Sequence, residues 1–157
     1  MQAKTVRESR TEQVQLVRNT HINGNKRLFG GALMQWIDTV GGVVARRHSG
    51  REVTTACVDN LQFRSAVVIN STVVLVGKMT YVGRTSMEVR VDTYVEHLSD
   101  GMRYPINRAY FTMVGLDEKD KPCRIPRLTI KSEEEKAEWE AAEKRREMRM
   151  HRRKEGF

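Results

Sequence analysis

The chain has 157 residues, of which 39% are hydrophobic and 31% charged, a composition typical of one globular domain that excludes a disordered chain. No apolar run approaches the roughly 20 residues of a membrane span, and the N-terminus lacks a signal-peptide core, so we expect a cytoplasmic protein with no membrane partner. The net charge of +8 favours a polyanionic partner, and both nucleic acid and a small, highly phosphorylated ligand satisfy it.

Sequence motifs help to distinguish nucleic acid from a small phosphorylated ligand as the partner. No helix-turn-helix, zinc-finger or RNP-like pattern occurs, and only 6% of the residues are aromatic, so we expect no nucleic-acid partner. The two cysteines, Cys57 and Cys123, lack metal-type spacing, which indicates reduced thiols and no metal site.

The first elements predicted along the chain are a strand and a long helix. Residues 11–18 alternate in polarity, which is typical of a strand, and a polar Gly/Asn stretch follows. From about Gly31 to His48 the apolar residues recur at the spacing of one buried helix face: Leu33, Trp36, Ile37, Val40 and Val44. The helix ends in cations, and Gly50 is the expected stop.

The next part of the chain reads as strands separated by turn residues. The four apolar segments are residues 53–63, 71–82, 85–98 and 106–117. One strand, one helix buried on most sides and then four strands predict an α+β fold, with an antiparallel sheet wrapped around a central helix.

The C-terminal segment, residues 131–157, is dense in charged residues. Ser132 and Glu135 form a capping box, and no Gly or Pro occurs up to Lys154, so we expect a helix. Its apolar stripe is weak, which predicts an exposed helix outside the core that is dispensable for chemistry, with a neighbouring subunit as a candidate contact.

Three segments carry a family resemblance. They are NGNKRLFGGALMQWID at residues 23–38, TTACVDNLQF at 54–63 and VGRTSMEV at 82–89. This set resembles the hotdog-fold acyl-CoA thioesterases, in which an Asn stands seven residues before the first Gly of an FGG turn and an Asp stands eight after it. The resemblance implies a single hotdog domain at residues 1–130, with residues 131–157 as a charged helical extension.

The resemblance also implies a mechanism, hydrolysis of an acyl-CoA thioester to a free acid and coenzyme A. Asp38 is then the general base or the nucleophile, two roles that the sequence does not separate. Asn23 assists, and the Gly31 N–H at the helix start is the candidate oxyanion donor. Family members often read N-x-x-G before the FGG turn, whereas Gly24 here follows Asn23 directly, so Asn25 or His21 is an alternative source of the assisting group.

Two further segments are candidates for binding the substrate. In the Gly83-Arg84-Thr85-Ser86 turn, Arg84 is suited to a phosphate of coenzyme A, with the two hydroxyls as hydrogen-bond donors, and an exposed hairpin arginine is the plain alternative. Thr54 and Thr55, which follow the helix, are candidates for lining the acyl or pantetheine path.

The helix-end cations Arg46 and Arg47 either contact coenzyme A or cap the helix, and His48 is expected at the surface. No cofactor is expected, because coenzyme A is part of the substrate.

The expected partners are the acyl-CoA substrate and further copies of the chain. The resemblance implies dimers that join two sheets edge to edge and share their active sites, often as trimers of dimers. Two other functions stay open on the sequence: a non-catalytic acyl-CoA-binding hotdog module and a basic nucleic-acid-binding protein.

Overall fold

The computed structural model describes residues 1–157. The helices are α1 (Val6–Ser9), the 3-10 turn η1 (Asn19–His21), α2 (Gly30–Ser49) and α3 (Glu133–Glu155). The strands are β1 (Lys4–Thr5), β2 (Thr11–Leu16), β3 (Glu52–Asp59), β4 (Thr72–Val82), β5 (Ser86–Glu96), β6 (Arg103–Leu116) and β7 (Leu128–Thr129). The predicted helix and strands are therefore present, with ends shifted by a few residues.

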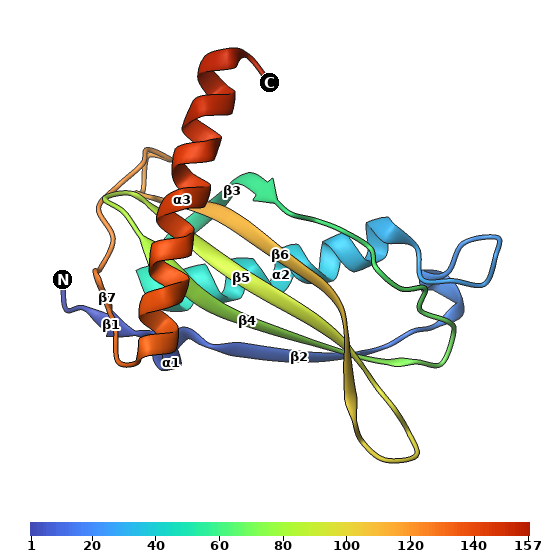
Figure 1. The fold of residues 1–157 in the computed structure, drawn as a ribbon. Coiled ribbons are helices and arrows are strands. Elements are labelled where there is room, and N and C mark those ends of the chain that lie inside the picture. The colour runs from blue at the N-terminus through green and yellow to red at the C-terminus, as the bar shows by residue number, and fades with distance from the viewer.

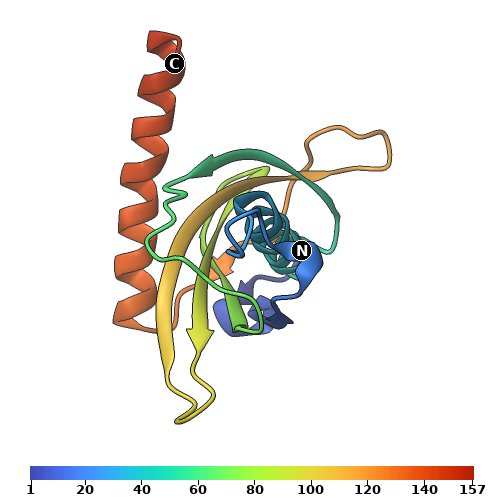
Figure 2. The ribbon, with the colours of Figure 1, turned by 90° about the vertical axis from the view of Figure 1, so that its right-hand side faces the viewer.

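Five strands form one antiparallel sheet in the order β2-β4-β5-β6-β3, with α2 lying along one face (Figure 1). The sheet curls around α2, as the view along the helix shows (Figure 2). β2 and β3 are the two edges of this sheet, so each is hydrogen-bonded on one side only. The predicted α+β class, a sheet wrapped around a central helix, is confirmed.

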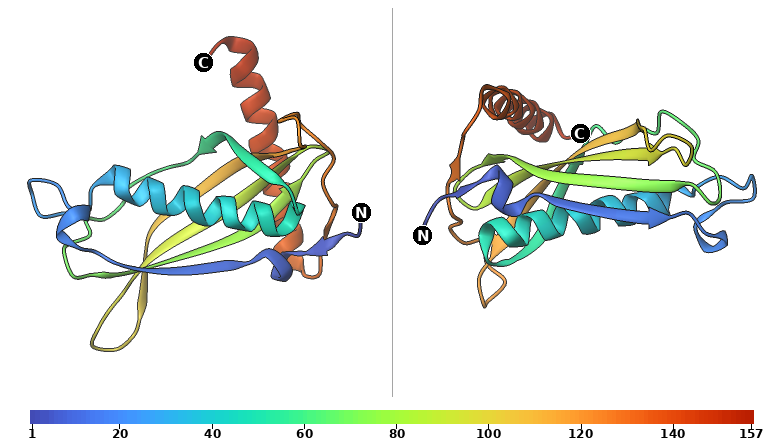
Figure 3. Two further views of the ribbon diagram at one scale, coloured as in Figure 1. Left: turned by 180° about the vertical axis from the view of Figure 1, so that it is seen from behind. Right: turned by 90° about the horizontal axis from the view of Figure 1, so that it is seen from below.

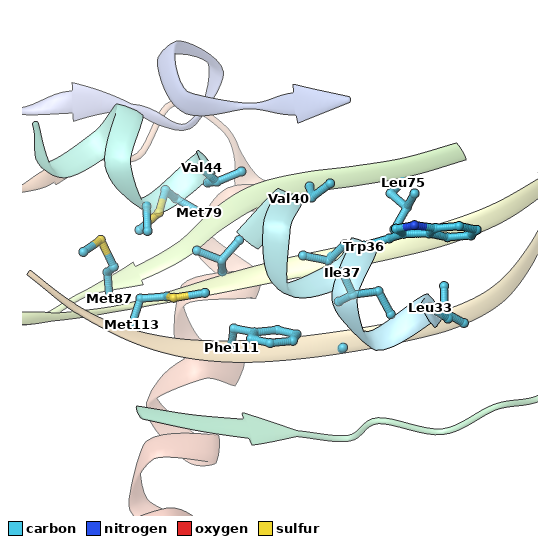
Figure 4. Packing of buried hydrophobic residues seen from close by; sticks show 14 of the residues in the cluster. Leu33, Trp36, Ile37, Val40, Val44, Leu75, Met79, Met87, Phe111 and Met113 are labelled. Carbon is cyan, nitrogen blue, oxygen red and sulfur yellow. The ribbon is translucent and has the colours of Figure 1, made fainter. Parts of the chain in front are cut away.

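The core lies between α2 and the concave face of the sheet. The predicted apolar face of α2 is buried, and it packs on strand side chains that include Leu75, Met79, Phe111 and Met113 (Figure 4). Gly77 of β4 allows a close approach, because a Cβ there would lie 2.8 Å from side-chain carbons of both Val40 and Val44. The helix and sheet are in contact at this point without room for another methyl group.

Helix α3 covers the opposite, convex face, so the molecule has three layers, as the view from below shows (Figure 3). Its ion pairs run from β4 to β3 as the helix proceeds. Near its start, Glu134 pairs with Lys78 of β4. In the middle, Glu138 pairs with Arg90 and Arg145 with Glu88, both on β5, and near the end Arg149 and Arg152 pair with Asp59 of β3. The Trp139 ring packs against the Tyr81 ring, tilted by 45°, at 4.4 Å between ring centroids. The predicted helix is present and most of its residues are exposed, but polar and aromatic contacts that the sequence did not indicate attach it to its own sheet.

The first residues of the chain form two short elements, β1 and α1, that the sequence did not predict. β1 pairs in parallel with β7, and α1 is closed by a capping box between Thr5 and Glu8. These pairings tie the N-terminus to the segment that leads into α3. None of the helices combines the length and the apolar character needed to cross a membrane.

Candidate active site

Asp38 lies on the third turn of α2 and faces β3. The Thr55 hydroxyl donates a hydrogen bond to Asp38 Oδ1 at 2.8 Å, and it also lies 3.3 Å from Met113 Sδ. Asp38 is exposed in the single chain, so its other carboxylate oxygen is open to solvent or to a ligand. Thr55, expected along the substrate path, therefore has a different contact: it holds the candidate catalytic carboxylate.

A β-bulge follows directly after Thr55. The β3–β6 register pairs Thr55 with Met113 and Cys57 with Thr112, so Ala56 is the extra residue. A bulge reverses which face of the sheet the following side chains occupy and is common beside active sites. Thr55 thus faces α2, while the end of β3 faces α3.

Asn23 lies in the loop before α2. Its Oδ1 accepts hydrogen bonds from the backbone N–H groups of Asn25 and Arg27, at 3.0 and 3.3 Å, which closes an Asx-type turn. Its amide nitrogen has no partner within the chain and is exposed, so it is available as a donor. The Asx turn fixes the side chain, which is a requirement for positioning a ligand.

The two alternatives to Asn23 differ in what they contact. His21 Nδ1 accepts a hydrogen bond from the Arg18 N–H at 3.0 Å, and the His21 ring packs edge-on against Trp36 at 4.9 Å between centroids. These contacts give His21 a structural part in the loop. Asn25 is exposed, and its backbone, not its side chain, makes the contact with Asn23.

The start of α2 leaves backbone donors free. Neither Gly30 nor Gly31 donates its N–H to a carbonyl, since the first such bonds in α2 come from Ala32 and Leu33 to Phe29. A Cβ at position 31 would lie 2.5 Å from the Phe29 ring, so this position requires glycine unless the ring moves. Free N–H groups at a helix N-terminus are suited to an oxyanion.

An open hollow of about 370 Å³ lies beside this glycine pair. It is lined by Asn23, Arg27, Leu28, Gly30, Leu33, Phe63, Arg64, Ser65, Ala66 and Val67. Asp38 is not among these residues, and it lies about 12 Å along the helix axis from Gly30 at 1.5 Å per residue. One chain therefore brings Asn23 and Gly30 to the same hollow but keeps Asp38 apart from them.

The Gly83-Arg84-Thr85-Ser86 turn is fixed by its backbone. Gly83 N–H donates to the Ser86 carbonyl at 2.8 Å, and the carbonyls of Thr85 and Arg84 accept from Gly115 and Ile125. The hydroxyl residues are half-buried in this arrangement, while Arg84 is exposed.

Arg84 lines a second open hollow, of about 440 Å³, together with Met1, Gly83, Arg124, Ile125, Pro126 and Arg127. None of its three arginines has an ion-pair partner in the chain. Three unpaired guanidinium groups around one hollow are suited to phosphate oxygens. The sequence indicated only Arg84, because Arg124 and Arg127 reach this place through the fold.

The cations at the end of α2 have structural contacts. Arg46 pairs with Glu52 at 2.8 Å, and Arg47 donates to the carbonyl of Arg10 and the hydroxyl of Thr11. The expectation of a surface His48 is wrong: the ring is buried, and Nε2 lies 2.9 Å from the Pro126 carbonyl. Burial lowers the pKa of His48, so the neutral ring with a proton on Nε2 fits this contact.

Sequence comparison identifies relatives over most of the chain. The thioesterase superfamily profile matches residues 25–100. The chain is 36% identical to YkhA of Bacillus subtilis, named as an acyl-CoA thioester hydrolase, over 82% of this chain and 75% of that protein. It is 31% identical to the cytosolic acyl coenzyme A thioester hydrolase of Rattus norvegicus, over 87% of this chain but 36% of that protein. The chain thus spans about a third of that relative's length.

Solved structures share the whole fold. A hexameric acyl-CoA thioesterase in its apo form superposes with a TM-score of 0.91 at 36% identity, over 97% of each chain. The Staphylococcus aureus acyl-CoA hydrolase with butyryl coenzyme A and coenzyme A gives 0.92 at 29% identity, over 98% of this chain and 93% of that one. Alanine variants of that hydrolase exist at an Asn, an Asp and a Thr, which lie 15 and 17 residues apart. By identity, coverage and architecture, the chain belongs to the thioesterase superfamily, as a hotdog-fold thioester hydrolase.

Proposed function

We propose that the protein hydrolyses acyl-CoA thioesters to a carboxylic acid and coenzyme A, with Asp38 as the reacting carboxylate. The observation that carries the proposal is the Asp38 side chain, the only carboxylate on α2, exposed and held by the Thr55 hydroxyl at 2.8 Å. A fixed carboxylate with one free oxygen serves either as a general base toward water or as a nucleophile.

The proposed reaction has few steps. With Asp38 as base, the carboxylate takes a proton from water while the water oxygen attacks the thioester carbon. The resulting oxyanion is stabilised by the free N–H of Gly31, whose donor has no other partner. The carbon–sulfur bond then breaks, and the leaving thiolate of coenzyme A takes up the proton that Asp38 carries, which restores the carboxylate. Asn23, with its free amide nitrogen, orients the thioester oxygen or the water.

The solved variants of the Staphylococcus aureus hydrolase support the choice of residues. The Asn, Asp and Thr substituted there have separations of 15 and 17 residues, and Asn23, Asp38 and Thr55 have the same separations here. That protein's complex with butyryl coenzyme A and coenzyme A supports an acyl-CoA as the ligand class.

We further propose that each site is shared between two chains. β3 is an edge strand with an unpaired side, and its residues Thr54, Ala56 and Val58 are exposed, as an interface strand requires. Exposed apolar side chains, Phe29, Met34 and Phe63, lie on or beside α2. Pairing two β3 edges would cover these groups and bring Asp38 of one chain toward Asn23 of the other. The hexameric relative supports three such dimers in one assembly.

The phosphates of coenzyme A are assigned to the hollow with Arg84, Arg124 and Arg127. Binding of these phosphates would account for part of the net charge of +8, so that no nucleic-acid partner is needed to explain it. We place the reaction in the cytosol, the compartment that the name of the Rattus norvegicus relative gives.

Release of free thiol from short, medium and long acyl-CoAs tests the proposal. The wild-type protein should hydrolyse at least one chain length, and Asp38→Asn should lower kcat by roughly 10²-fold or more, because it keeps the shape but removes the charge. Saturable binding of acyl-CoA by a wild-type protein that releases no thiol would instead identify a non-catalytic binding module.

A further inference from the structure

Strand β3 has contacts on both faces of the sheet, with α2 through Thr55 and with α3 through Asp59. The bulge at Ala56 makes this possible. Thr55 and Asp59 are four residues apart, so a regular strand would point them to the same face. With Ala56 as an extra residue, Thr55 pairs with Met113 of the core-facing set, whereas Asp59 pairs with Tyr110. Asp59 therefore lies on the convex face, beneath α3.

Two arginines of α3 bind the Asp59 carboxylate. Arg149 Nη1 donates to Oδ2 at 3.0 Å, and Arg152 Nη2 donates to Oδ1 at 2.5 Å. The side chains of Asp59 and Arg149 are only 11% and 13% exposed, so solvent screens this pair weakly.

The arginines of α3 are in turn anchored within the sheet. Arg149 also contacts Glu88 of β5 at 3.4 Å, and the fully buried Glu88 accepts from Arg145 at 2.7 Å. Arg145 stacks on the Tyr110 ring at 3.7 Å. The contact to Asp59 is thus an extension of a network that begins on a central strand.

Two acceptor atoms lie within reach of the Thr55 hydroxyl. Asp38 Oδ1 lies at 2.8 Å and Met113 Sδ at 3.3 Å, so a small shift of β3 would exchange the carboxylate for the sulfur. The β3–β6 ladder is interrupted at the bulge beside Thr55, so the backbone there is held less firmly than in a regular ladder.

We propose that Asp59, clamped by Arg149 and Arg152, is a positioning residue for the reaction: it fixes the end of β3 so that the Thr55 hydroxyl stays on Asp38. The proposal rests on the function proposed above, because it acts through the Thr55–Asp38 contact. The structure gives α3 a part in catalysis although none of its residues touches the candidate substrate site.

Asp59→Asn tests this role, since the amide keeps the size of the side chain but weakens both ion pairs. We expect kcat to fall about tenfold or more, by analogy with the loss that a misplacement of about 1 Å causes, while KM changes little. Arg152→Gln, which removes one of the two donors, should cause a smaller fall and serves if Asp59→Asn does not fold. Thermal unfolding and elution volume verify that the variants remain folded and assembled.

Two matched controls lie on the same helix. Glu134→Gln removes the ion pair at the other end of α3, and Arg153→Ala removes an exposed arginine with no ion pair. Both should leave kcat within about twofold of the wild type, because surface changes of this kind have small effects.

A double-mutant cycle with Thr55→Val separates positioning from general destabilisation. If Asp59 acts through Thr55, Asp59→Asn should lower kcat in the wild type but should have little further effect in the Thr55→Val background. Equal falls in both backgrounds, or an unchanged kcat for Asp59→Asn in the wild type, would overturn the proposal. The function proposed above fails separately, if Asp38→Asn retains wild-type turnover.

Discussion

The Thr55 hydroxyl on β3 donates a hydrogen bond to the Asp38 carboxylate on α2, at 2.8 Å. This bond joins the central helix to an edge strand, and it occupies one oxygen of the only carboxylate on α2. A carboxylate held in this way presents its second oxygen in a defined direction, which is what a positioned base requires.

Substitution of Thr55 measures the value of this bond. Thr55→Val keeps the branched shape but removes the hydroxyl, so we expect kcat to fall by about 10-fold to 10²-fold, since the carboxylate loses its orientation. Thr55→Ser keeps the hydroxyl and should retain far more of the turnover. Steady-state kinetics of both variants checks this, and equal kcat values for the two would remove the hydroxyl from the mechanism.

Arg84 should act on binding and not on chemistry. Arg84→Ala should raise KM for acyl-CoA by about 10-fold and change kcat little, because a phosphate contact far from the thioester is equally strong in the ground and transition states. Arg46→Ala is the control, since Arg46 is paired with Glu52. An Arg84→Ala variant whose KM matches that of the control at low and high salt would place coenzyme A elsewhere.

Removal of α3 should destabilise the fold, which reverses the expectation from the sequence. A chain that ends near Ile130 loses the partners of Glu88 and Asp59, and it uncovers the apolar contact of Trp139 on Tyr81. Loss of partners from a buried charge amounts to about 3–5 kcal/mol, which corresponds to a fall in Tm of roughly 10 °C or more for a domain of this size. Differential scanning calorimetry gives the answer, and an unchanged Tm would show that α3 is an appendage.

His48 should make stability fall in mild acid. Its pKa is lowered in the fold by burial, with Lys4 acting in the same direction, while the Pro126 carbonyl and Glu8 act in the opposite one. The unfolded chain therefore takes up the proton first: this contribution is complete above the ordinary value of 6.5 and is lost as the pH falls from 6.5 toward the folded-state pKa.

His48→Gln retains a donor for the Pro126 carbonyl but cannot be protonated. Its Tm relative to the wild type should therefore rise as the pH is lowered from 7.5 to 5. A Tm difference that stays constant over this range would mean that His48 does not titrate on unfolding.

The sequence predicts the parts of the fold that periodicity and turn chemistry encode locally. The apolar face of α2, its stop at Gly50 and the four long strands all follow from such patterns. The Asn23, Gly30 and Asp38 spacing identifies candidate groups along the chain, and their role stays a prediction. The ion pairs under α3 could not be predicted, because charges that alternate along a helix look the same whether a sheet or water faces them.

The partner of Asp38 was likewise beyond prediction. The turn after α2 brings β3 back along the helix, so that Thr55 lies beside the Asp38 carboxylate. Thr55 directly precedes the bulge at Ala56, and a bulge leaves no periodic signal in the sequence. The burial of His48 has a similar origin, since its partner Pro126 is 78 residues away along the chain. Contacts of this range arise from topology and not from local pattern.

Complementation between two inactive variants tests the central claim, that Asn23 of one chain and Asp38 of another serve one thioester. Asn23→Ala and Asp38→Asn proteins are mixed, unfolded and refolded together, and the formation of mixed dimers is verified by mass spectrometry. A mixed dimer then has one site with both defects and one site with neither. If half of the dimers are mixed, activity should return to about a quarter of the wild-type value, because each mixed dimer has one intact site. A refolded mixture that contains mixed dimers but is as inactive as its parents would contradict the shared site.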